Sequence, residues 1–180
     1  TAGLIAKRAG LPIARFVAAT NINDVVPAYL DQGLFAPRPS VPTLSNAMDV
    51  GNPSNFERMR WLYDDDLAAM RADIAGCRYS DDEGRATIRR VYEERGYLLD
   101  PHSAIGYLGI RDYLRAKAGA ADRIGIFLAT AHPAKFSEVV EPALGRPIEL
   151  PGPLADAVAR PRHVLKIAAS FEAVRRTLVA

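Results

Sequence analysis

A threonine, a histidine and a lysine follow a short apolar run in the C-terminal half of the sequence. The run at 124–130 (IGIFLAT) is typical of a strand buried in a parallel sheet, and a helix is predicted at 133–144. Ligands of open α/β sheets bind where strands present their carboxyl ends. The pattern therefore predicts a ligand-facing edge at Thr130, His132 and Lys135. A loop or core role for His132 and a surface role for Lys135 are the open alternatives.

The same order of strand, polar edge and helix occurs near the start of the sequence. The apolar run 13–19 (IARFVAA) predicts a buried strand, and Asn23 or Asp24 could cap the helix that begins at Val25. A long loop is expected between Gly33 and Asn55, because this stretch contains four prolines and few periodic apolar positions. Its hydroxyl and amide groups could bind phosphate or carboxylate, or could instead serve the turns of the loop itself.

Asp100, His102 and Ser103 superficially suggest a nucleophilic triad. Residues so close in sequence cannot align as nucleophile, base and orienting group. We therefore predict that Asp100 or Ser103 caps the helix expected at 101–118.

The remaining periodicity predicts an α/β fold with parallel strands and flanking helices. Helices are expected at 1–9, at 55–76 in two stripes, and at 80–95, where Ser80 and Glu83 have the spacing of a capping box. A further helix is expected at 167–179, with a helical turn at 155–159 and a short strand as an option at 97–100. Residues 1–52 and 97–180 would form the α/β part, and about 53–96 a small helical insertion.

Composition excludes several classes of protein. The 180 residues are 49% hydrophobic and carry a net charge of +2 from interleaved charges, so no footprint for nucleic acid or an anionic membrane is expected. No apolar run reaches the ~20 residues of a membrane helix. The single cysteine, Cys77, permits neither an internal disulfide nor a thiolate zinc site, and it favours a reducing, cytoplasmic setting.

Four motifs, in order and spacing, resemble threonine synthase: ATNINDVVP at 19–27, PTLSNAMDVGNPSNFERM at 42–59, DPHSAIGY at 100–107 and ATAHPAKF at 129–136. The resemblance runs from the helix after that family's Gly-Asn-Phe-Gly phosphate loop to the carboxyl terminus. It implies the C-terminal part of a three-layer, tryptophan synthase β-like fold (fold type II of enzymes that use pyridoxal 5'-phosphate). The implied enzyme is a carbon–oxygen lyase that converts O-phospho-L-homoserine and water to L-threonine and phosphate.

The resemblance also implies roles for individual residues. Thr130 would face the pyridine nitrogen of the cofactor, where a hydroxyl does not hold that nitrogen protonated as a carboxylate would. Thr1 and Ala2 begin the helix that would point at the cofactor phosphate. The implied ligands of the substrate's phosphate and carboxylate are Asn21, Asn23, Ser45, Asn46 and Lys135.

The lysine that forms the family's Schiff base is expected in a missing N-terminal half of the same enzyme. The four lysines of this chain lie outside that family's Ser-Phe-Lys-Asp context. We therefore expect no catalytic residue in this chain, and neither bound cofactor nor turnover without the other half. Three alternatives stay open: a non-catalytic interaction or regulatory module, a related phospho-lyase, and an unrelated anion-binding α/β domain.

Overall fold

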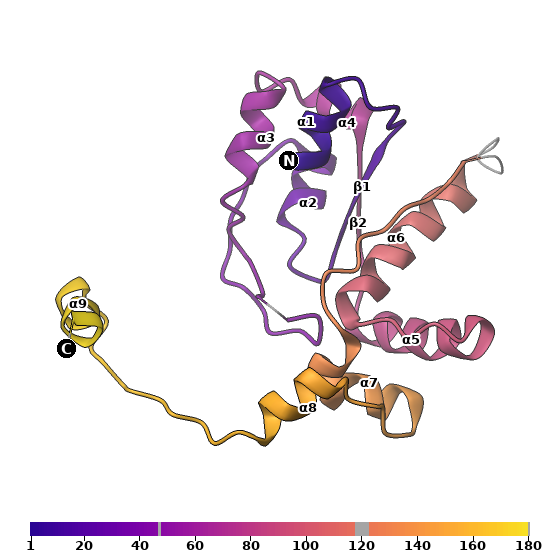
Figure 1. Ribbon diagram of the computed structural model, residues 1–180. Coiled ribbons are helices and arrows are strands. Elements are labelled where there is room, and N and C mark those ends of the chain that lie inside the picture. Colours follow the sequence, from indigo (N-terminus) through magenta and orange to yellow (C-terminus); the bar gives the residue numbers. More distant parts are fainter. Residues whose placement is uncertain (47, 118–122, 180) are drawn as a thin grey trace. The chain divides into compact units, whose positions relative to one another are not determined.

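The computed structural model describes residues 1–46, 48–117 and 123–179 (Figure 1). The chain divides into two compact units, Thr1–Ile148 and Glu149–Ala180. Each unit is described by itself below. The predicted division into an α/β part and an insertion at about 53–96 stays a prediction.

The first unit contains a parallel pair of strands, β1 (Phe16–Thr20) and β2 (Ile74–Arg78). Their register runs from Phe16 opposite Ile74 to Thr20 opposite Arg78. The predicted first strand is confirmed, with its bounds shifted toward the carboxyl end. The helix predicted up to residue 76 is wrong, because the chain leaves helix at Asp73 and pairs with β1. Pairing with a distant strand overrides the local helical pattern there.

Four helices cover one face of this sheet: α1 (Ala2–Arg8), α2 (Val25–Gln32), α3 (Phe56–Leu62) and α4 (Leu67–Asp73). Their buried side chains form one apolar cluster with Ile74 of β2. Helix α2 approaches β2 closely at Gly76, where a Cβ atom would lie 2.8 Å from the Cα of Pro27. A side chain at Gly76 would therefore push α2 away from the sheet.

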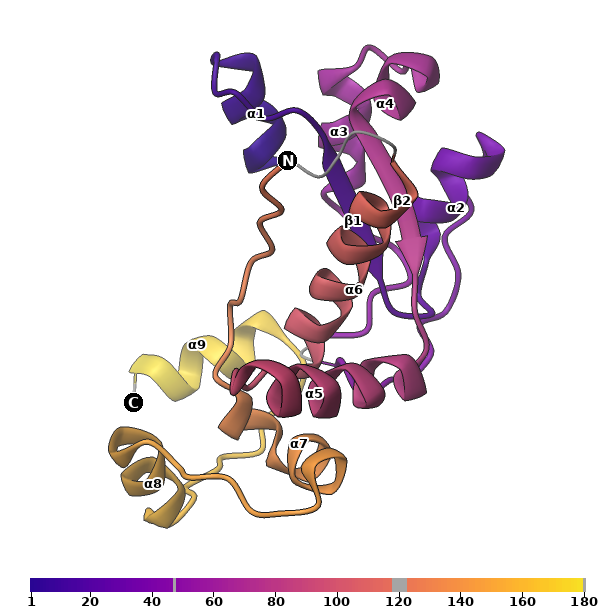
Figure 2. The same ribbon diagram turned by 90° about the vertical axis from the view of Figure 1, so that its right-hand side faces the viewer.

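Helix α6 (Pro101–Ala116) packs on the opposite face, so the unit has three layers (Figures 1 and 2). A Cβ atom on Gly109 would lie 2.6 Å from the Cβ of Ala19. A second apolar cluster joins α6 to α5 (Asp81–Arg95) and to α7 (Ser137–Leu144), which follows the 3-10 turn η1 (Pro133–Phe136). The predicted capping box of Ser80 and Glu83 is present, and Gly96 ends α5 with a φ of 65°.

The strand predicted at 124–130 is wrong: the segment pairs with no other strand in the described parts of the chain. The segment instead runs along α6, with Gly125 against Ile110 and the Phe127 ring 5.9 Å from that of Tyr107. The side chains that alternate with Gly125 and Phe127 are 77–90% exposed, namely Ile124, Ile126 and Leu128. The period of two is therefore present, but a strand also requires hydrogen bonds to a neighbour.

The possible strand at 97–100 is not formed either, and these residues link α5 to α6 without regular structure. The second unit contains α8 (Gly152–Ala159) and α9 (Phe171–Val179), which confirms helices in the two terminal segments. Among the described residues, no helix combines the length and hydropathy needed to cross a bilayer.

Candidate functional site

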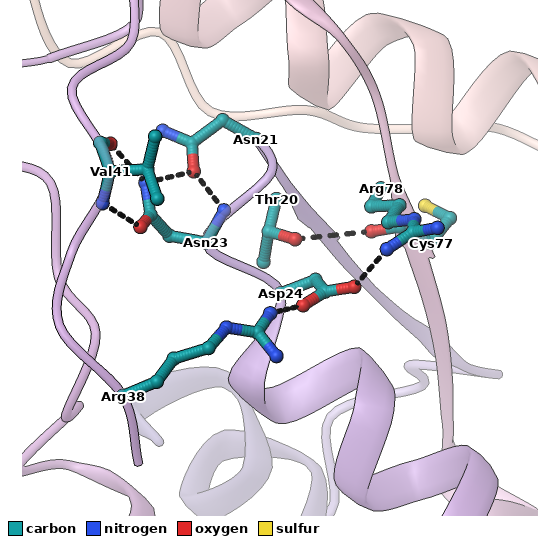
Figure 3. A network of polar contacts seen from close by, with 8 residues as sticks. All are labelled: Thr20, Asn21, Asn23, Asp24, Arg38, Val41, Cys77 and Arg78. Carbon is teal, nitrogen blue, oxygen red and sulfur yellow. Dashed lines mark hydrogen bonds and ion pairs between the residues drawn. The ribbon is translucent and has the colours of Figure 1, made fainter. Parts of the chain in front are cut away.

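The carboxyl end of β1 leads into a polar turn that is fixed by two asparagines. The Oδ1 atom of Asn21 accepts hydrogen bonds from the backbone N–H of Asn23 (2.9 Å) and from its side-chain amide (3.0 Å). Asn23 is 8% exposed and forms two hydrogen bonds with the backbone of Val41 in the loop 33–55. Its side-chain amide donates to the Val41 carbonyl (2.9 Å), and its Oδ1 atom accepts from the Val41 N–H (2.8 Å). These two hydrogen bonds therefore hold the loop against the turn (Figure 3).

Asp49 organises the polar side chains at this junction. Its Oδ1 atom accepts from the Thr43 hydroxyl (2.7 Å) and from the side-chain amides of Asn21 and Asn23 (3.2 Å each). Its Oδ2 atom accepts from the Thr43 N–H (3.0 Å). The Asn21 amide also donates to the hydroxyls of Thr43 (2.9 Å) and Ser45 (3.2 Å). These bonds fix the amides and hydroxyls before any ligand arrives.

Asp24 holds the other end of the loop. Its buried carboxylate pairs with Arg38 of the loop and with Arg78 of β2, the latter at 2.8 Å (Figure 3). Asp24 occupies the N-cap position of α2 but makes no side-chain capping bond, so the expected cap is wrong. The two guanidinium groups bind the carboxylate in place of the helix N–H groups.

A pocket of about 270 Å³ opens beside this network at the carboxyl end of β1. Asn21, Asn23 and Ser45 line it together with His102 and Ile105 of α6. The remaining lining residues are small or apolar: Ala19, Thr20, Val25, Val26, Met48, Val50 and Pro53. The pocket therefore combines a few fixed polar groups with apolar walls, the usual composition of a small-molecule site.

Asp100 supplies the predicted cap of α6 and contacts the histidine in the pocket. Its Oδ1 atom accepts from the N–H groups of His102 (2.9 Å) and Ser103 (3.2 Å) and lies 3.3 Å from His102 Nδ1. Burial would raise the pKa of this carboxyl, but the hydrogen bonds from His102 and Ser103 outweigh that effect and lower the pKa below its usual value. Asp100 is therefore a buried carboxylate anion at neutral pH.

Comparison with known proteins shows that this chain is similar to the threonine synthases. The family model described as "Threonine synthase, C-terminal" matches residues 103–178. Threonine synthase of Escherichia coli (strain K12) is 41% identical over 179 residues, which are 99% of this chain and 40% of the relative. In sequence, the chain corresponds to the C-terminal region of the threonine synthases.

Solved threonine synthase structures agree with this assignment. The Escherichia coli crystal structure superposes with a TM-score of 0.85 at 39% identity, over 99% of this chain and 40% of that chain. The structure of the Brucella melitensis enzyme, described as PLP bound, gives a TM-score of 0.84 at 34% identity over 98% of this chain and 42% of that chain. The chain thus spans about 40% of the length of these threonine synthases.

Three of the residues predicted to bind the substrate's phosphate and carboxylate lie together in the pocket lining, namely Asn21, Asn23 and Ser45. Asn46 is exposed in the same loop but is not among the residues that line the pocket. Thr130, His132 and Lys135 are exposed and lie outside the pocket lining, and the Nδ1 atom of His132 accepts from the Ala134 N–H (3.1 Å) at the start of η1.

The two predicted cofactor residues at the start of the chain lie at the beginning of α1. Ala2 is exposed, whereas the hydroxyl oxygen of Thr1 is buried and has no hydrogen-bond partner in the described part of the chain. Neither residue lines the pocket.

Sequence reasoning missed three residues of the site: Thr43, Asp49 and His102. Asp49 stands in a stretch already noted for its polar groups, but nothing local indicates its contact with Asn23, 26 residues earlier. The local sequence indicates His102 only as part of a helix start. Its place in the pocket follows from the packing of α6 on the sheet.

Proposed function

We propose that this chain forms the substrate side of an enzyme that converts O-phospho-L-homoserine and water to L-threonine and phosphate with pyridoxal 5'-phosphate. It acts when joined to the N-terminal region of a threonine synthase. The observation that carries the proposal is the pocket at the end of β1, with Asn21, Asn23 and Ser45 fixed on its wall. Such prearranged polar groups bind a small polar substrate at little cost in conformational entropy.

Two hydroxyl groups of this chain support the proposed cofactor contacts. The buried, unpartnered hydroxyl of Thr1 is an orphaned polar atom of the kind that a bound group satisfies. The hydroxyl of Thr130 is exposed on the unpaired segment after α6, so it is open to contact by another part of the enzyme. When bound, pyridoxal phosphate supplies an electron sink for carbanion chemistry at the amino acid.

Each residue then has a role in binding or orientation. Thr1 and Ala2 would contact the cofactor phosphate, and the Thr130 hydroxyl would meet the ring nitrogen without keeping it protonated. Asn21, Asn23 and Ser45 would bind the charged groups of the substrate in the pocket. The substrate contacts predicted for Asn46 and Lys135 stay predictions, because both residues lie outside the pocket lining. The apolar wall formed by Val25, Val26 and Ile105 would exclude water from the reacting carbon atoms.

The lysine that anchors the cofactor comes, in this proposal, from the N-terminal region. The ammonium of Lys7 is bound to Asp73 at 2.7 Å and to the Ala14 carbonyl at 3.1 Å, so it is engaged elsewhere. Lys135 is exposed on η1 and lies outside the pocket lining.

A chimeric enzyme tests the proposal. This chain would replace the aligned C-terminal region of Escherichia coli threonine synthase, to which it is 41% identical over 179 residues. We expect the purified chimera to release threonine and phosphate in equal amounts from O-phospho-L-homoserine. The matched control is the chimera with Asn21→Ala, which should bind substrate more weakly.

Two results would contradict the proposal. A chimera that folds and binds the cofactor but forms neither product favours a non-catalytic module. A chimera that releases phosphate without threonine favours a phospho-lyase. Cofactor absorbance and the unfolding curve of each chimera separate these results from a simple failure to fold.

A further inference from the structure

Asp49 acts only as a hydrogen-bond acceptor in the polar network beside the pocket. Its Oδ2 atom accepts from the Thr43 N–H (3.0 Å), and its Oδ1 atom accepts from the Thr43 hydroxyl (2.7 Å). A hydroxyl group has one hydrogen to donate. The hydrogen of the Thr43 hydroxyl is therefore used by Asp49, and the Thr43 oxygen can only accept from its other neighbours.

The side-chain hydrogens of both asparagines are also used within this network. The Asn21 amide donates to the hydroxyl oxygens of Thr43 (2.9 Å) and Ser45 (3.2 Å). It also donates to Oδ1 of Asp49 (3.2 Å). The Asn23 amide likewise faces three acceptors, one of them Oδ1 of Asp49 (3.2 Å). An amide has two hydrogens, so either asparagine could donate to a ligand only by giving up one of these contacts.

The Ser45 hydroxyl is the donor that this network leaves for the pocket. Ser45 is 6% exposed and lines the pocket, and its oxygen accepts from the Asn21 amide. Within residues 1–46, 48–117 and 123–179, its other hydrogen-bonding neighbour is the Thr43 hydroxyl oxygen at 3.4 Å, which is long for two hydroxyl groups. A ligand oxygen at a normal distance would therefore take the Ser45 hydrogen.

We propose that Asp49 is a positioning residue that acts through Thr43 and Asn21, and that the Ser45 hydroxyl donates its hydrogen to an anionic oxygen of the substrate. This inference rests on the proposed function, because it takes O-phospho-L-homoserine as the occupant of the pocket. Hydrogen bonds to an anion are roughly twice as strong as those between neutral groups, so the serine exchanges its long contact with Thr43 for the ligand. The phosphate and the carboxylate of the substrate share this chemistry.

Calorimetric titration of the cofactor-loaded chimera tests the inference without turnover. The probes are inorganic phosphate and L-homoserine, which carry the phosphate and the carboxylate of the substrate separately. We expect Ser45→Ala to weaken the binding of one probe about tenfold, and Asp49→Asn to weaken the same probe about three- to tenfold. The probe that is affected identifies the group that Ser45 binds.

Two results separate positioning from a general effect on charge or fold. Removal of a negative charge would by itself tighten the binding of an anion, so weaker binding in Asp49→Asn is opposite to the electrostatic effect. In the Ser45→Ala background, Asp49→Asn should cause no further loss, because Asp49 acts through the serine. The matched control is Asp31→Asn, which removes the same charge at an exposed position of α2 and should leave both affinities unchanged.

A second variant tests the link between Asp49 and Ser45 with no change of charge. Thr43→Val removes the hydroxyl that donates to Asp49 and accepts from Asn21, and it should weaken the same probe as Asp49→Asn does. This variant decides the question if Asp49→Asn does not fold. Unfolding curves that match the wild type show that a loss of affinity is not a loss of fold.

The inference is overturned if Ser45→Ala keeps wild-type affinity for both probes, if Asp49→Asn and Thr43→Val bind both as tightly as the wild type, or if the losses in the double variant add. A chimera that makes no threonine but shows the expected losses refutes the proposed function alone. An active chimera without these losses refutes this inference alone. Titration of the 180-residue chain repeats the test if the chimera does not bind the cofactor.

Discussion

The substitution Asn23→Asp replaces the side-chain nitrogen of Asn23 with oxygen. This side chain joins the turn after β1 to the loop through its hydrogen bonds with Val41. The side-chain amide of Asn23 faces three acceptors: Oδ1 of Asn21 (3.0 Å), the Val41 carbonyl (2.9 Å) and Oδ1 of Asp49 (3.2 Å). In the variant a carboxylate oxygen faces all three. The shape of the side chain is kept, so no cavity complicates the result.

The cost follows from the number of bonds lost. The two amide hydrogens serve three acceptors, which corresponds to two or three hydrogen bonds of about 1 kcal/mol each, or about 2–3 kcal/mol in total. Repulsion between the new carboxylate and Asp49 adds to this cost. The free energy that keeps the loop closed falls by the same amount, so the Val41 amide should exchange its hydrogen about 30- to 150-fold faster.

Hydrogen exchange at Val41 is the direct assay, because this N–H donates to Oδ1 of Asn23 at 2.8 Å. The matched control is Asn46→Asp, which adds the same charge at an exposed position of the same loop. We expect the control to leave Val41 exchange nearly unchanged. Equal protection of Val41 in wild type and Asn23→Asp would refute the reasoning that this amide closes the loop.

Two further substitutions test the packing and the charge of α6. Gly109→Ala should lower the free energy of unfolding by about 1–3 kcal/mol in urea titrations, because the new Cβ would lie 2.6 Å from Ala19 Cβ and 3.1 Å from Cys77 Sγ. An unchanged free energy of unfolding would mean that α6 does not pack so closely on the sheet. Asp100→Asn keeps a side chain that can cap α6 but removes the carboxyl group, whose pKa is lowered in the folded protein. The stability that this charge adds is present above the unfolded-state pKa of about 3.9 and is lost as the pH falls through the lower folded-state pKa. The wild type should therefore exceed the variant in unfolding free energy at neutral pH, and the gap should narrow on acidification; a gap independent of pH would contradict this account.

Local signals in the sequence predicted several parts of the fold. The capping box of Ser80 and Glu83 and the cap at Asp100 were predicted correctly because each depends on residues within a few positions. Strand β2 was missed and a strand at 124–130 was wrongly expected. Both errors have one cause, since strand formation depends on a partner that lies far away in the chain.

Ordered motifs in the sequence indicated the resemblance to threonine synthase, and the order of apolar strand, polar residues and helix indicated a polar edge at the end of β1. Which of those residues meet depends on packing between segments that lie far apart in the chain. Asp49 joins Asn21 and Asn23 across a loop, and Asp100 holds His102 at the same pocket. These contacts arise because the loop folds back over the carboxyl end of β1 and α6 packs on the sheet, and neither event leaves a local pattern in the sequence.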